Sequence, residues 1–233
     1  MSSATYIARR QQLETYFDRT AVEAWKRLTS DAPVGSIRAT VRAGRDTMRS
    51  TLLSWLPGDL RGARILDAGC GTGALAIEAA RRGADVVAID ISPTLVDLAR
   101  ERAPADLGTG RVSFAAGDML DPALGRFDHV VAMDSLIHYD GKDIAQTLAQ
   151  FAARTRGSLL FTIAPRTPAL TVMLAMGRLF PRSDRSPAIA PISRQALERH
   201  ARPHKTLDGW RFARSQRVSR GFYISEAQEV IAP

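Results

Sequence analysis

Residues 65–73 read ILDAGCGTG: an apolar strand ends in an acid, and a glycine-rich turn follows it. The pattern predicts a buried strand at 64–67 and an alanine-rich helix at 73–82. Glycine tolerates positive φ and lets a ligand pass close to the backbone. Several classes of nucleotide-binding α/β domain share such a turn, so the glycines by themselves do not identify the ligand.

Strands and helices alternate on the C-terminal side of this turn. The further strands are expected at 85–90, 111–116, 127–133 and 158–163. The helices between them are expected at 93–102, where Ser92 is the cap and Pro93 the first residue, and at 142–155. This alternation predicts a parallel sheet covered by helices, an α/β, Rossmann-like fold. Two last strands, at 205–214 and 217–225, are expected to form an antiparallel hairpin at the sheet edge, which gives seven strands.

The segments around this core predict two additions to it. Helices are expected at 3–29 and 36–56, so residues 1–58 would form an N-terminal helical cap on a core of residues 59–233. Residues 165–190 hold four prolines around an apolar stretch. We expect them to form an arm inserted after the fifth strand, ahead of a helix at about 193–202.

Length and composition fit one domain of this kind. The chain has 233 residues, enough for an α/β core with a modest cap. Its one cysteine, Cys70, excludes an internal disulfide and fits a reducing compartment. The sequence shows no secretory signal and no apolar run near the roughly 20 residues that span a bilayer. We therefore expect a cytoplasmic protein.

The net charge of +8 is concentrated at the two ends of the chain. Residues 1–62 carry 10 basic and 6 acidic side chains, residues 63–161 carry 10 and 13, and residues 162–233 carry 12 and 5. Basic flanks can serve an anionic partner: a nucleic acid, an anionic lipid or an acidic substrate. They can equally be the solvated surface of an arginine-rich protein, and both readings stay open.

Three acids at successive strand ends indicate the ligand. Asp67 stands two residues before the first glycine, where a carboxylate would repel a pyrophosphate but would suit the ammonium group of S-adenosylmethionine (SAM). Asp90 can bridge the ribose hydroxyls, and Asp118 can accept from the adenine amino group. Any one of these acids could instead be a helix N-cap, but three in order favour SAM. The predicted cofactor contacts are Asp67, Gly69, Cys70, Gly71, Gly73, Asp90, Ile91, Asp118, Met119 and Asp134.

The residues after the fourth strand, DSLIHY at 134–139, bear on the chemistry. They lack the Asn/Asp-Pro-Pro-aromatic tetrad of enzymes that methylate base amino groups. His138 is the acid–base candidate, since an imidazole titrates near neutrality; a hydrogen-bonded scaffold histidine is the alternative. His129, His200 and His204 are interpreted as structural. No metal-ligand spacing and no Ser-His-Asp arrangement is evident in the sequence.

The whole chain resembles the magnesium-protoporphyrin IX O-methyltransferases of (bacterio)chlorophyll biosynthesis. The glycine motif is common to many methyltransferases, whereas other segments are more specific to this family. The matching segments are Tyr16-Phe17, Trp25-Lys26-Arg27, residues 67–73, Leu136-Ile137-His138-Tyr139, residues 177–181 and residues 221–225.

The resemblance implies transfer of a methyl group from SAM to one propionate of Mg-protoporphyrin IX, without a protein-bound metal, and assigns His138 a part in the transfer. Residues 165–190 would then cover the macrocycle. It also implies the porphyrin-binding subunit of magnesium chelatase as a partner and peripheral contact with the photosynthetic inner membrane. Some members carry a tyrosine implicated in transfer where this chain has Thr29, which puts any tyrosine-dependent step in doubt.

Other functions fit parts of the sequence. A methyltransferase acting on a quinone precursor or on RNA would share the cofactor motif, although no RNA-binding appendage or aromatic-stacking motif is evident. A dinucleotide oxidoreductase is disfavoured by Asp67 and by the terminal hairpin. A porphyrin carrier that kept the fold without catalysis would differ only in forming no product.

Overall fold

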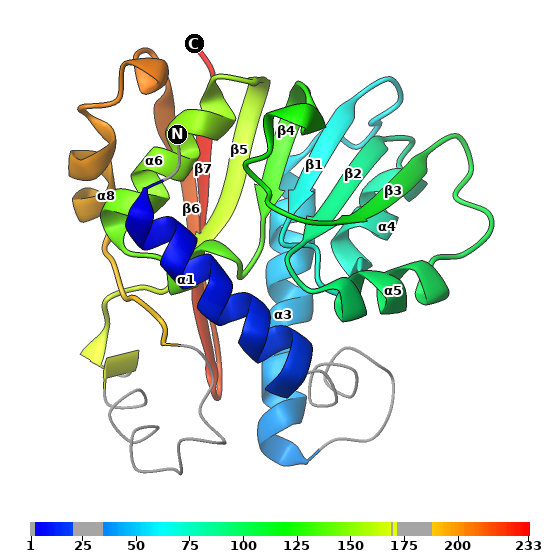
Figure 1. Cartoon of the computed structure of the whole chain (residues 1–233), viewed down its shortest axis with the longest axis horizontal. Helices are drawn as coiled ribbons and strands as arrows, with labels where there is room; N and C mark the ends of the chain where they lie inside the picture. The colour runs from blue at the N-terminus through cyan, green and yellow to red at the C-terminus, as the bar shows by residue number, and fades with distance from the viewer. Residues whose placement is uncertain (1–2, 21–34, 169, 172–187) are drawn as a thin grey trace.

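The computed structural model describes residues 3–20, 35–168, 170–171 and 188–233. Its seven strands form one sheet in the order β3-β2-β1-β4-β5-β7-β6 (Figure 1). The strands are β1 (Arg64–Ala68), β2 (Asp85–Asp90), β3 (Arg111–Ala116), β4 (Phe127–Ala132), β5 (Thr155–Ile163), β6 (Arg211–Arg220) and β7 (Tyr223–Ile231). The first five are parallel, and β7 runs antiparallel to both of its neighbours, β5 and β6. This confirms the predicted Rossmann-like fold with an antiparallel hairpin at one edge.

Helices cover both faces of the sheet because neighbouring residues of its inner strands point to opposite sides. Ile65 of β1 packs in one apolar cluster with Met48 and Leu52, while the next residue, Leu66, packs in a second cluster with Phe151. The α-helices are α1 (Ala4–Thr15), α3 (Ser36–Trp55), α4 (Ala74–Arg81), α5 (Pro93–Arg102), α6 (Gly141–Ala152) and α8 (Arg194–Ala201). Short 3-10 turns lie at η2 (Pro122–Leu124), η3 (Leu136–His138) and η5 (Lys205–Leu207).

The predicted hairpin strands were wrong in their position. The turn lies at residues 221–222, not between 214 and 217, and Lys205–Leu207 is a 3-10 turn. The polar run at 214–217 looks like a turn but belongs to the edge strand β6, whose side chains are mostly exposed. Its arginines pair with acids on β7, Arg214 with Glu229 and Arg217 with Glu226. Gly221, at a φ of 55°, supplies the left-handed residue that the real turn needs.

The segment predicted as a helix at 3–29 is helical from Ala4 to Thr20, where its described part ends. The α-helix to Thr15 continues as a π-helix, η1 (Tyr16–Thr20); residues 21–29, including Trp25 and Thr29, lie outside the described residues. Asp18 of η1 accepts from the Thr94 hydroxyl at 2.7 Å, which fixes the end of this segment to the start of α5. Most of the predicted arm also lies outside the described residues, although its first residue, Pro165, forms a β-bridge with Ile192, two residues beyond its end.

The division at residue 58 stays a prediction, and both N-terminal helices contribute side chains to the core. α1 contributes Tyr6 and Leu13 to one core cluster, and α3 contributes its apolar face to the other. Across the described residues, no helix combines the length and the apolar character that a membrane span requires.

Candidate functional site

A pocket that opens to solvent lies at the carboxyl ends of the central strands. The strand order reverses between β1 and β4, and open parallel sheets bind ligands at such a point. Helix α1 crosses in front of this end of the sheet (Figure 1). The pocket is lined by Tyr6, Leu13, Phe17, Arg45, Gly69, Gly71, Ile89, Asp90, Ile91, Leu95, Gly117, Met119, Met133, Asp134, Ser135, His138 and Tyr139.

The glycine turn borders this pocket with its backbone. Gly69 has a φ of 86°, and a Cβ added there would overlap the Ser135 side chain, so only glycine fits. Gly69 and Gly71 line the pocket, whereas the predicted contacts Cys70 and Gly73 do not. Burial raises the pKa of the Cys70 thiol well above its usual range, which argues against a nucleophilic role.

Asp67 and Asp90 are both buried beside this turn. Asp90 lines the pocket and accepts hydrogen bonds from the backbone N–H groups of Gly71 at 2.8 Å and Ser92 at 3.0 Å. Asp67 does not line the pocket, and its Oδ2 has no partner among the described residues. Burial and the charge of Asp90 raise the pKa of Asp67 to about 7. Asp67 does not line the pocket, so the predicted contact of its carboxylate with the ammonium group of SAM stays a prediction.

The third acid has a partner on α1. Gly117 and Met119 line the pocket, but the carboxylate of Asp118 between them accepts from the Tyr6 hydroxyl at 2.8 Å and pairs with Arg10. The proposed contact of Asp118 with adenine therefore stays a prediction. The contact holds α1 across the pocket, where Tyr6 and Leu13 form part of the wall. This wall was not predicted; its only signal in the sequence is the apolar spacing of the first helix.

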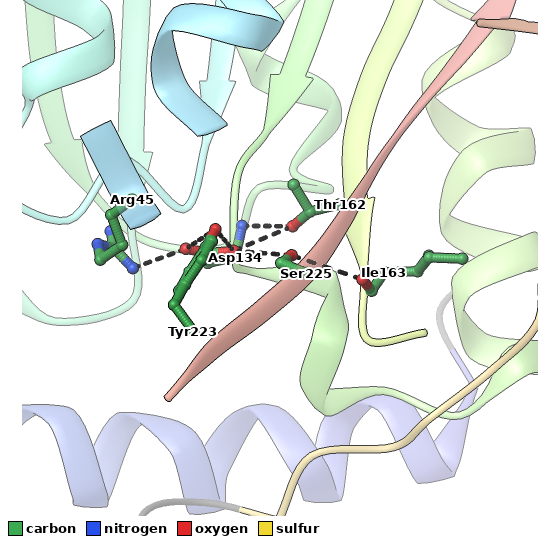
Figure 2. Close-up of polar contacts among 6 residues, drawn as sticks. All are labelled: Arg45, Asp134, Thr162, Ile163, Tyr223 and Ser225. Carbon is green, nitrogen blue, oxygen red and sulfur yellow. Dashed lines mark hydrogen bonds and ion pairs between the residues drawn. The ribbon is translucent and has the colours of Figure 1, made fainter. Parts of the chain in front are cut away.

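Asp134 is the centre of a polar network that joins three distant parts of the chain (Figure 2). It is the one non-glycine residue with positive φ, 55°, in the described chain. Its carboxylate pairs with Arg45 of α3 at 2.8 Å and accepts from the Tyr223 hydroxyl at 3.0 Å. Its backbone N–H donates to Thr162 Oγ1 at 2.8 Å. Arg45 is thereby held in the pocket wall.

The network explains the family segment at 221–225, whose role the sequence did not reveal. Tyr223 contacts Asp134, and Ser225 approaches the same carboxylate at 3.4 Å. Burial and the Asp134 charge raise the pKa of the Tyr223 hydroxyl far above its usual value, so it remains a donor. A Cβ at Gly44 of α3 would overlap the Tyr223 ring, which shows how closely the hairpin packs on this helix.

His138 lies in η3 on the pocket wall and is only 7% exposed. Its Nδ1 is 3.4 Å from the Ala188 carbonyl oxygen, and its ring meets Phe17 edge-on. Burial lowers its pKa to about 4, so the imidazole is neutral at physiological pH. His129, interpreted as structural, bonds to Ser158 between β4 and β5 and does not line the pocket.

Comparison with known proteins identifies the family of this chain. The Magnesium-protoporphyrin IX methyltransferase C-terminus family matches residues 132–232, and a general methyltransferase domain matches residues 65–157. A magnesium-protoporphyrin O-methyltransferase of Rhodobacter capsulatus is 53% identical over 96% of this chain and 97% of its own length. The chain belongs to the magnesium-protoporphyrin O-methyltransferase family.

Solved structures support the same family. Magnesium protoporphyrin IX methyltransferase from Synechocystis with bound S-adenosylhomocysteine (SAH) superposes with a TM-score of 0.83 at 28% identity, covering 96% of this chain and all of that one. A ubiquinone biosynthesis O-methyltransferase of Xanthomonas oryzae matches less of the chain: it is 31% identical over 78% of this chain and 76% of its own length. Among the described residues of this family member, no three His, Cys, Asp or Glu side chains are grouped as metal ligands.

Proposed function

We propose that this protein transfers the methyl group of SAM to one propionate carboxylate of Mg-protoporphyrin IX and releases the monomethyl ester. The observation that carries the proposal is the 53% identity to the Rhodobacter enzyme over nearly the full length of both chains. The pocket supports it, because its lining offers an apolar wall, an acid at the second strand end and an Arg–Asp pair.

The pocket offers complementary groups for both ends of SAM. Ile91, Leu95 and Met119 form an apolar wall for adenine, and Asp90 stands where it would accept the ribose hydroxyls. Arg45 and Asp134 lie side by side with opposite charges, 2.8 Å apart. Such a pair complements an amino-acid zwitterion: the guanidinium would bind the methionine carboxylate and Asp134 the ammonium.

Arg45→Gln is expected to weaken binding of SAH at least tenfold, because the glutamine loses the charge that would face the methionine carboxylate. Binding of 5′-methylthioadenosine, which has no amino-acid end, should change less than twofold. Isothermal titration calorimetry of both ligands checks this. Equal losses for the two ligands would contradict the zwitterion assignment and indicate a general disturbance of the pocket.

Methyl transfer to a carboxylate depends more on positioning the two reactants than on a general base. A propionate is ionised at neutral pH and attacks as it stands; an oxygen–methyl bond forms while the methyl–sulfur bond breaks and its electron pair stays on sulfur. Good alignment of the two reactants supplies roughly 7–11 kcal/mol. A neutral, buried His138 beside Phe17 would exclude water from the carboxylate and fix its direction.

The remaining parts of the proposal concern the arm at residues 165–190, the partners of the protein and the alternative acceptors. On the basis of the family resemblance, we place residues 165–190 over the macrocycle. On the same basis, we propose that the protein is cytoplasmic and that its partners are the porphyrin-binding subunit of magnesium chelatase and a membrane surface. The same pocket would serve a quinone precursor or RNA as alternative acceptors. Incubation with SAM and each acceptor, followed by mass spectrometry, tests the choice: Mg-protoporphyrin should gain one methyl and the others none.

A further inference from the structure

Three arginines of α3 line one face of that helix. Arg38, Arg42 and Arg45 follow one another at intervals of four and three residues, which keeps their side chains together. Arg45, at the inner end, lines the pocket. At a rise of 1.5 Å per residue, Arg42 and Arg38 stand about 4.5 and 10.5 Å further along the axis. This end of α3 extends beyond the carboxyl edge of the sheet (Figure 1), and Arg38 is exposed while Arg42 is half-buried. The arginines thus lead outward from the pocket.

The positive charge of Arg38 is electrostatically unfavourable at its position in the helix. It lies in the first turn of α3, where the backbone N–H groups give a partial positive charge that favours acids. This first turn has no acidic residue and no side-chain cap. A local rule broken without a local gain is typical of a functional site. Arg49, further along the same face, pairs with Asp46 one turn away at 2.8 Å.

The acceptor offers a matching group. Mg-protoporphyrin carries its two propionates along one edge of a flat, apolar macrocycle. When one propionate lies at the methyl donor, the other therefore points outward from the pocket. We infer that Arg38 and Arg42 bind the propionate that is not methylated. The inference rests on the proposed function, since it needs an acceptor with two carboxylates. It also gives a reason for a single methylation: turning the monoester around would put an uncharged ester against the two arginines.

The test compares Mg-protoporphyrin with its dimethyl ester, which has the same macrocycle and no charge. Porphyrin fluorescence measures binding to the wild type, to the double variant Arg38→Gln/Arg42→Gln and to the control Arg49→Gln. The wild type and the control should prefer the diacid at least tenfold. The double variant should lose that preference, with its affinity for the dimethyl ester within twofold of the wild type. Prolonged incubation of the double variant with SAM should also release some diester.

Other outcomes overturn the inference. An unchanged preference in the double variant would mean a solvated helix face, and equal losses for both porphyrins would mean a structural role. If the variant kept the preference but lost binding to phosphatidylglycerol vesicles, the arginines would serve a membrane surface. A wild type that binds both porphyrins but methylates neither would refute the proposed function instead, so the two failures are separable.

Discussion

Replacing His138 with alanine is expected to lower the turnover number roughly 10- to 100-fold while the KM values for SAM and porphyrin change less than threefold. The imidazole is buried on the pocket wall, so its loss admits water and loosens the acceptor. General-base catalysis would cost ~10²–10⁴-fold, and a carboxylate nucleophile does not need a base. Steady-state kinetics of His138→Ala measure the effect. The control is His204→Ala, because His204 lies outside this pocket. A loss confined to cofactor affinity would make His138 a binding residue.

The pH dependence separates the possible roles of this histidine. Its pKa of about 4 lies below the ~6.5 of an exposed imidazole in the unfolded chain. The unfolded state therefore takes up the proton first, and the stability contributed by neutral His138 is complete above pH 6.5 and lost as the pH falls towards 4. Between pH 6.5 and 9 the kcat of the wild type should show no inflection from His138. A rise of kcat through pH 6.5 that disappears in His138→Ala would contradict the neutral, positioning role.

Replacing Asp90 with alanine is expected to weaken SAH binding at least tenfold, about 1.4 kcal/mol. Two effects combine: the carboxylate that we propose as the acceptor for the ribose hydroxyls is removed, and the Gly71 and Ser92 N–H groups lose the acceptor that shapes the turn. Calorimetry with SAH measures it, with Asp97→Ala as the control, because Asp97 is an exposed acid of α5 paired with Arg100. Unlike Arg45→Gln, this variant should weaken 5′-methylthioadenosine as well. Unchanged SAH affinity would refute the site assignment.

The core of the fold could be predicted from the sequence because its local signals agree. Strands buried on both faces appear as short apolar runs. The inner strand β2 and the edge strand β3 both have the predicted bounds. Ser92 accepts from the Leu95 N–H and caps α5 as expected. The hairpin was displaced because an edge strand such as β6 is mostly exposed, so a polar stretch within it resembles a turn.

The site was predictable only where its residues follow strand ends. Asp67, Asp90 and Asp134 each lie within two residues of the carboxyl end of a strand, so their common location follows from a parallel sheet. The partners of Asp134 could not be found in this way. Arg45 and Tyr223 each lie 89 residues from it in sequence, and their meeting depends on how α3 and the hairpin pack.

The central claim is that a propionate of the magnesium porphyrin receives the methyl group. The direct measurement uses SAM with a trideuterated methyl group, Mg-protoporphyrin IX and the purified protein, and follows the porphyrin by mass spectrometry before and after mild alkaline hydrolysis. The account predicts a gain of one trideuteromethyl group, no second addition, and complete loss of the label on hydrolysis, as an ester requires. A label that survives hydrolysis, or a porphyrin that gains none while SAM is bound, would contradict it.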